Sequence, residues 1–116
     1  MAMKKVARTY SRYGREAVGV LGYLIRIHRL ERKLSVAEVA ERVGVSRYLI
    51  QRIESGDPRC AIGVAFEAAS ILGVTLFEED RHKLTARIRE QEEKLRLLPK
   101  AIHKPRTTAT AVKDDF

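Results

Sequence analysis

The chain has 116 residues, of which 45% are hydrophobic and 33% charged, as expected for one modest globular domain with extensions. No apolar run approaches the roughly 20 residues that a membrane span needs, and residues 1–15 are basic but lack the apolar segment of a secretory signal. The single cysteine, Cys60, rules out an internal disulfide and fits a reducing compartment. We therefore expect a cytoplasmic protein that does not contact a membrane.

The net charge of +8 is unevenly distributed. Residues 1–33 carry a net charge of +7, residues 34–80 carry −4 and residues 81–116 carry +5. Because phosphate binding depends on locally placed cations, the flanks would supply much of the attraction to a nucleic acid. The basic arm, residues 1–15, fits either an arm that tracks DNA or a solvated disordered tail. Its basic residues are Lys4, Lys5, Arg8, Arg12 and Arg15.

Two helices are predicted before residue 45. The first covers about residues 16–32, and its core face consists of Leu21, Leu24, Ile25 and His28. The second opens at Ser35, which forms an S-x-x-E capping box with Glu38. Its apolar residues share one helical face and are Val36, Val39, Ala40 and Val43. Gly44 ends this helix because glycine readily adopts the left-handed conformation.

A third helix follows a Gly-Val-Ser turn and is capped by Ser46. Its apolar side, which faces the second helix, consists of Leu49, Ile50 and Ile53. Its other side carries two long cationic side chains, an aromatic ring and an amide, namely Arg47, Arg52, Tyr48 and Gln51. Two short helices joined by a tight turn, the second with such a surface, are typical of a helix-turn-helix that reads the DNA major groove.

Further along the chain, Asp57-Pro58 predicts a turn, because the residue before proline is pushed out of helical geometry. A fourth helix is predicted over about residues 62–72, although Ala61 stands where a capping Ser or Thr would be better. Gly73 ends it. The core face of this helix consists of Ala65, Ala68, Ala69 and Leu72.

The last predicted helix, residues 80–98, is amphipathic. Leu84, Ile88, Gln91, Leu95 and Leu98 form an a/d seam over two heptads. This seam fits either pairing with a second copy in a homodimer or packing on the protein's own core. Two heptads are marginal alone, so pairing would need support from the globular domain. Residues 99–116 have no apolar periodicity and are predicted to be a disordered tail.

From Leu21 the chain reads LG-x-x-IR-x-x-R-x-x-x-x-LS, then E-x-A and GVS, then I-x-x-IE-x-G. This pattern, over residues 21–77, resembles the DNA-binding domain of the phage-repressor and Cro-type family, often called XRE. The resemblance implies an all-α fold with a four- to five-helix repressor-like domain over residues 16–79. It also implies an ion pair between Arg29 and Glu54. The positions that would read a palindromic operator are Ser46, Arg47, Tyr48, Gln51 and Arg52.

The family often carries a phosphate-contacting Gln where this chain has Val36, so Val36 is not carried over as a site. The XRE-like domain, the Gly-Asp-Pro turn followed by Ile-Gly, and the acidic-aromatic end together resemble HipB-type antitoxins. This second resemblance implies a DNA-bound homodimer that holds a HipA-type kinase toxin and represses the shared operon. The tail residues proposed to bind the toxin are Asp114, Asp115 and Phe116. A stand-alone repressor is the alternative, and a small enzyme or an RNA-binding adaptor comes third.

Enzymatic interpretations find little support in the sequence. His28, His82 and His103 are far apart and have no metal-ligand spacing with Cys60, so no metal site is predicted. The chain has no phosphate-binding glycine loop and no paired acid-base residues. We therefore expect neither an enzymatic activity nor a cofactor.

Overall fold

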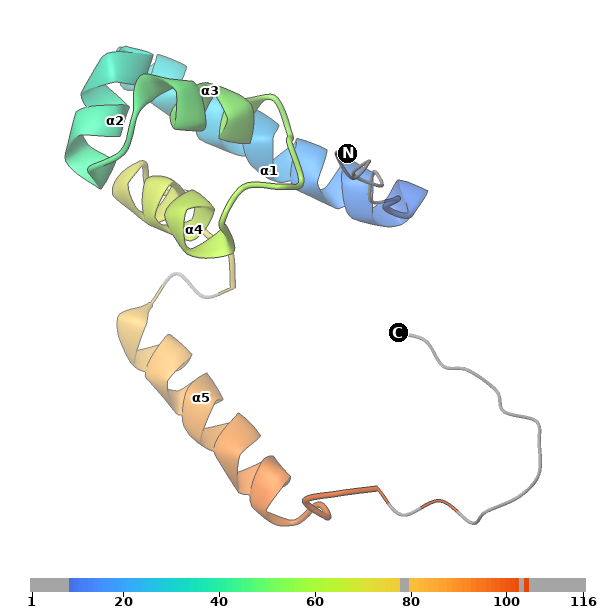
Figure 1. Cartoon of the computed structure of the whole chain (residues 1–116). Helices are drawn as coiled ribbons and strands as arrows, with labels where there is room; N and C mark the ends of the chain where they lie inside the picture. The colour runs from blue at the N-terminus through green and yellow to red at the C-terminus, as the bar shows by residue number, and fades with distance from the viewer. Residues whose placement is uncertain (1–8, 78–79, 103, 105–116) are drawn as a thin grey trace. The chain divides into compact units, whose positions relative to one another are not determined.

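The computed structural model describes residues 9–77, 80–102 and 104. Five α-helices and no strand are found among these residues, which confirms the predicted all-α class (Figure 1). The chain divides into two compact units, residues 1–77 and 78–116. The first unit contains α1 (Arg12–Glu31), α2 (Val36–Val43), α3 (Arg47–Glu54) and α4 (Ile62–Ile71), and the second contains α5 (Arg81–Arg96).

The first helix is longer than the sequence pattern predicted. It begins at Arg12 and not near Glu16, because the Ser11 hydroxyl accepts a hydrogen bond from the Gly14 backbone N–H at 3.0 Å and caps the new start. Within the first turns, Arg12 Nε also donates to Glu16 Oε2 at 3.1 Å. Arg12 and Arg15 of the predicted arm are therefore helical, whereas Lys4, Lys5 and Arg8 lie outside the described residues.

The helix-turn-helix is fixed by local hydrogen bonds. The capping box forms as predicted: the Glu38 backbone N–H donates to Ser35 Oγ at 3.0 Å, and the Ser35 N–H donates to Glu38 Oε1 at 2.8 Å. Gly44 ends α2 with a φ of 87°. Ser46 then caps α3 by accepting from the Leu49 N–H at 3.1 Å. These caps set the turn between the two helices.

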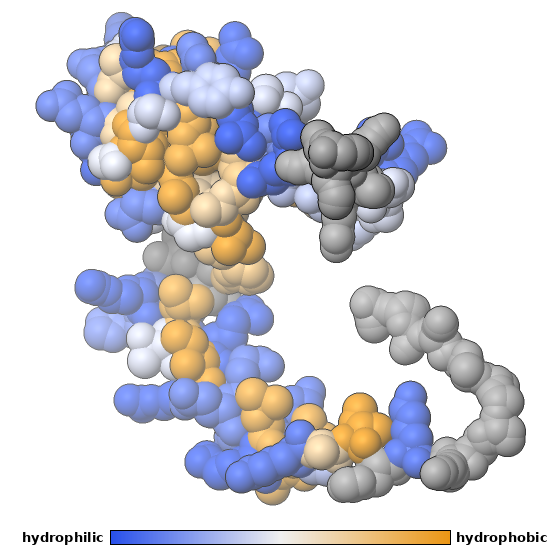
Figure 2. All heavy atoms as spheres, viewed as in Figure 1, coloured by the Kyte–Doolittle hydropathy of each residue, from blue (hydrophilic) through white to orange (hydrophobic). Residues whose placement is uncertain are grey.

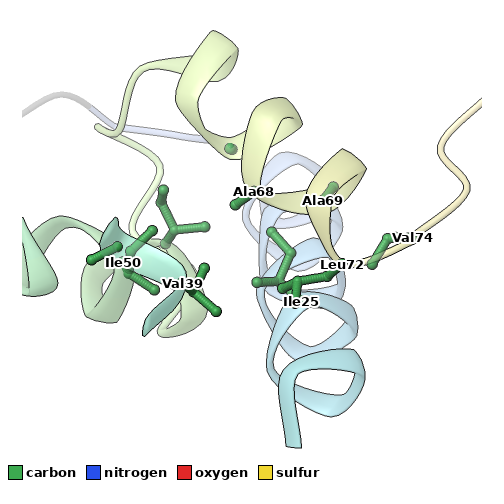
Figure 3. Close-up of a cluster of buried hydrophobic side chains, with 10 residues drawn as sticks. Ile25, Val39, Ile50, Ala68, Ala69, Leu72 and Val74 are labelled. Carbon is green, nitrogen blue, oxygen red and sulfur yellow. The ribbon is translucent and has the colours of Figure 1, made fainter. Parts of the chain in front are cut away.

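All four helices of the first unit contribute to one apolar core (Figure 3). Both α1 and α2 pack against α3 and α4. Gly22 permits the close approach of α1 to α3, because a Cβ there would lie 2.6 Å from the Ile53 carbonyl oxygen. The alanine face predicted for α4 is buried, as is Leu72 directly after the helix. The fully buried large side chains are Ile25, Val39, Ile50 and Leu72.

The second unit has a different character. None of the residues of α5 is buried in the single chain, and hydrophobic residues alternate with hydrophilic ones along the helix surface (Figure 2). The helix opens at Asp80, whose Oδ1 accepts from the His82 backbone N–H at 2.8 Å. It ends at Arg96, so Leu98 lies beyond the last turn and not within the helix as predicted. The predicted tail residues 105–116 lie outside the described residues.

Candidate nucleic-acid interface

The third helix separates a buried apolar side from an exposed polar side. Ile50 and Ile53 are buried against the rest of the core. The opposite side and the capping position expose Ser46, Arg47, Tyr48 and Gln51, whereas Arg52 is half-buried. All five residues that the sequence analysis selected for DNA reading thus lie on the cap or the body of α3. The Tyr48 side chain is 67% exposed, so its ring is open to a ligand.

Arg52 is held in place by two neighbours. Its Nε donates to Asp57 Oδ2 at 2.8 Å, and its guanidinium carbon lies 5.6 Å from the centre of the Tyr48 ring. The hydrogen bond to Asp57 raises the pKa of Arg52 above its ordinary value. Arg52 is therefore a pre-positioned cation beside an aromatic ring and already engages one carboxylate. The sequence alone identified Arg52 as a long cationic side chain on the polar side of the helix and did not reveal its contact with Asp57.

Asp57 organises a second cation that sequence reasoning missed. The Arg59 side chain donates to Asp57 from Nε and Nη2, both at 3.0 Å, and the Arg59 backbone N–H donates to Asp57 Oδ1 at 2.9 Å. These bonds, followed by the bond from Arg52, hold the pKa of Asp57 well below its usual range. The Arg59 side chain is 71% exposed, so the loop just after α3 presents a cation to solvent. The available signal was the arginine following the predicted Asp-Pro turn.

The predicted support pair links α1 to the end of α3. Arg29 Nε donates to Glu54 Oε2 at 2.6 Å and Arg29 Nη2 donates to Glu54 Oε1 at 3.0 Å, in a bidentate arrangement. Both side chains are almost fully buried, with exposed fractions of 10% and 7%. Arg29 Nη1 also donates to the Leu34 carbonyl oxygen at 2.9 Å. The hydrogen bond to Glu54 raises the pKa of Arg29, so the guanidinium stays charged inside the fold.

A surface hollow of about 290 Å³ lies beside α3, lined by Arg26, Arg29, Val36, Gln51, Glu54 and Ser55. Val36 offers it only an apolar side chain. Arg26 and Gln51 are exposed and supply donors at its edge. Arg26 is a second residue that the sequence analysis did not select, because its proximity to Gln51 depends on how α1 packs against α3.

The remaining predicted residues fall in or beyond the second unit. Leu84, Ile88, Gln91 and Leu95 lie along α5 and are exposed in the single chain. Leu98 follows the helix and is also exposed. The proposed partner-binding residues, Asp114, Asp115 and Phe116, lie outside the described residues.

The part of the chain that the structure describes offers few groups suited to metal binding or catalysis. No group of three or more His, Cys, Asp or Glu side chains there could hold a metal ion. None of the described helices is long and apolar enough to cross a membrane. Partial burial raises the pKa of the Cys60 thiol, which opposes formation of a reactive thiolate. His28 lies at the edge of the core, with Nδ1 at 3.3 Å from the Leu72 carbonyl oxygen.

Comparison with known proteins adds one finding. The sequence profile of the helix-turn-helix domain family matches residues 20–84, more than half of the chain. The matched span contains α2, the turn and α3, together with most of α1 and all of α4. No curated protein and no solved structure matches the chain.

Proposed function

The chain belongs to the helix-turn-helix domain family, and we propose that it is a transcriptional regulator of the XRE type that acts in the cytoplasm on a palindromic operator in double-stranded DNA. The observation that carries this proposal is the exposed side of α3. A capping serine, an exposed arginine, an aromatic ring and an amide lie together there, and the opposite side of the helix packs on the buried core. Such a surface matches the donor and acceptor pattern of base edges in the major groove.

Each reading residue has a distinct chemical role in this proposal. Arg47 donates two hydrogen bonds to guanine O6 and N7, and Gln51 pairs with the N6 and N7 edge of adenine. Tyr48 contacts a thymine methyl group or donates its hydroxyl to a phosphate. Ser46 has its hydroxyl beside the first backbone N–H groups of α3, which favours a phosphate position at the helix N-terminus.

Arg52 and Arg59 form the second part of the reading surface. Asp57 holds both guanidinium groups, so they are ordered before DNA arrives and lose little conformational freedom on binding. Their exposed edges provide phosphate contacts that fix the register of α3 in the groove. Arg26 adds a further cation beside Gln51. The surface as a whole therefore combines base reading by α3 with phosphate binding around it.

A homodimer completes the proposed regulator. One α3 reads one half-site, and a two-fold dimer reads two half-sites about one helical turn apart. The α5 seam, formed by Leu84, Ile88, Gln91 and Leu95 and continued after the helix by Leu98, supplies the contact between protomers. Support for this step comes from the seam's spacing and from the exposure of its apolar side chains in the single chain.

We further propose that the regulator is the antitoxin of a type II toxin-antitoxin system and represses its own operon. Its partner is a HipA-type kinase toxin, bound in part through Asp114, Asp115 and Phe116. A terminal aromatic side chain that fills a pocket is an efficient anchor for a short segment, and the two carboxylates add orientation. The support for this step is the resemblance of the chain's motifs to HipB-type antitoxins.

Selection from a randomised DNA pool with the full-length chain tests the DNA-reading proposal. We expect an enriched two-fold symmetric sequence, and the enrichment should disappear when Arg47 and Gln51 are both changed to Ala. Ala37→Ser, on an exposed position of α2, is the matched control and should keep the wild-type sequence. A pool that stays random with the wild-type chain would refute sequence-specific reading.

Deletion of residues 110–116 tests the antitoxin proposal separately. We expect unchanged operator binding and weaker binding of a HipA-type kinase, measured by calorimetry with both purified proteins. If full-length and truncated chains bind the kinase equally, the tail is not the anchor. If neither binds it, the chain is a stand-alone repressor.

A further inference from the structure

A second exposed apolar surface runs along the outer side of α1. Five large side chains lie on it, with exposed fractions between 48% and 82%, and we call them the α1 stripe: Tyr13, Val20, Tyr23, Ile27 and Leu30. At 3.6 residues per turn these positions share one side of the helix. The core-facing side of α1 is the opposite one, which carries buried Gly22, Ile25 and Arg29. An exposed apolar surface of this kind is a candidate interaction site.

The spacing of the α1 stripe indicates that its partner is a helix. Its members are separated by seven, three, four and three residues, which is the a/d pattern of a coiled coil. Glu16 occupies the remaining seam position between Tyr13 and Val20, and its carboxylate is paired with Arg12. The seam extends about 26 Å along the helix axis at 1.5 Å per residue. A stripe of this length and regularity fits a second helix laid along α1.

The charges on the two flanks of the stripe indicate which helix fits. One flank carries Arg12, Gly19 and Arg26, and the other carries Ala17, Leu24 and Glu31. In two parallel copies of α1, each basic flank meets the flank with Glu31 on the other copy, which places Arg26 beside Glu31. In an antiparallel pair the two basic flanks meet each other. A parallel pair of α1 helices therefore places one pair of opposite charges, Arg26 and Glu31, on each side of the seam.

We propose that the α1 stripe binds the α1 stripe of a second copy of this chain in a parallel helix pair. This surface is separate from the α5 seam and lies within the first unit. Because Glu16 is a polar residue in an otherwise apolar seam, it weakens the pair and keeps association reversible. The proposal concerns self-association alone and does not depend on the identity of the DNA site or of a toxin.

The test uses the full-length chain carrying Leu95→Asp, which removes the α5 seam as a source of association. We expect sedimentation equilibrium to show residual dimerisation in this background. Adding Glu16→Leu should raise the association constant roughly tenfold, as expected when an apolar side chain replaces a polar one in a seam. Adding Ile27→Asp should lower it by a similar factor. Ala37→Asp, which introduces the same charge on an exposed site of α2, is the control and should change nothing.

A charge exchange tests the parallel orientation. Arg26→Glu and Glu31→Arg should each weaken dimerisation, and the double variant should restore it. An association constant that Glu16→Leu and Ile27→Asp leave unchanged would overturn the proposal, and so would a double exchange without rescue. Circular dichroism verifies that each variant is folded. Half-site DNA binding by the Glu16→Leu and Ile27→Asp variants should remain at the wild-type level, which separates this surface from DNA reading.

Discussion

The two units of the chain use their apolar residues in opposite ways. In α3 the apolar side is buried against the core, and the polar side remains exposed. In α5 no residue is buried in the single chain, and the apolar seam residues are themselves exposed. Amphipathic spacing alone therefore does not identify which side of a helix is available for binding. The spacing must be combined with which side the fold has already covered, because only the uncovered side is available to a partner.

Of the substitutions proposed here, Leu95→Asp is expected to have the largest effect, because it acts on the exposed apolar seam of α5. It places a charge in the proposed seam of both protomers and removes two Leu side chains from the contact, at about 1.5–3 kcal/mol each. We expect sedimentation to show weaker association, and binding to a palindromic operator to fall far more than binding to a half-site. Thermal unfolding of the helix-turn-helix unit should not change. An unaltered association constant would contradict a role for the α5 seam.

Glu54→Ala should destabilise the first unit, because it removes one partner of a buried ion pair. It leaves Arg29 as an uncompensated charge in a site that is 90% covered, at a cost of about 3–5 kcal/mol in the free energy of unfolding. Urea denaturation followed by circular dichroism measures the loss. Glu67→Ala removes an exposed carboxylate from α4 and is the matched control, with little expected change. Equal stability of the two variants would show that the ion pair contributes nothing to the fold.

The first unit was largely predictable because its determinants are local. The Ser35–Glu38 capping box and the positive φ of Gly44 follow from short-range hydrogen bonding and steric rules. The buried alanine face of α4 likewise follows from helical spacing. The start of α1 at Arg12 was missed because Tyr13 is the only large apolar residue in 12–15, so the Ser11 cap is the main mark of the boundary.

Arg59, the second cation held by Asp57, was missed for a different reason. Asp57 meets Arg52 because the chain turns back after α3, where the Asp57 backbone N–H donates to the Arg52 carbonyl oxygen at 3.0 Å. That return brings Arg59 to the same carboxylate, and neither contact has a spacing rule that could be read from the residues alone. The polar residues proposed to read DNA lie on one side of α3 and at its cap, as their helical spacing predicted. Arg59 was visible in the sequence as an arginine after the Asp-Pro turn, but its contact with Asp57 depends on how the loop folds.

Arg47→Ala should weaken DNA binding without altering the thermal stability of the fold. Losing one bidentate base contact costs about 1–3 kcal/mol of operator binding and relaxes preference at one base pair. The midpoint of thermal unfolding should stay the same, because Arg47 is exposed. Arg42→Ala removes an equal charge from an exposed site on α2 and controls for the loss of a cation. Fluorescence anisotropy with operator and random DNA at fixed salt measures both affinities, and a wild-type affinity of the Arg47 variant for the operator would contradict the assignment.

The last prediction concerns how the stability contributed by Asp57, which is paired with Arg52 and Arg59, depends on pH. The folded state lowers the pKa of Asp57 because Arg59 and Arg52 donate to its carboxylate. A lowered folded pKa means that the carboxylate stabilises the fold fully above the ordinary value of about 4 and loses this contribution as pH falls below it. Asp57→Asn should therefore be less stable than the wild type near neutral pH, and the difference in urea midpoint should shrink under acid conditions. Glu67→Gln removes one negative charge elsewhere and controls for net charge. A difference that stays constant down to the acid limit would show that Asp57 acts through the shape of the loop and not through its charge, in which case Arg52 and Arg59 are ordered by packing alone.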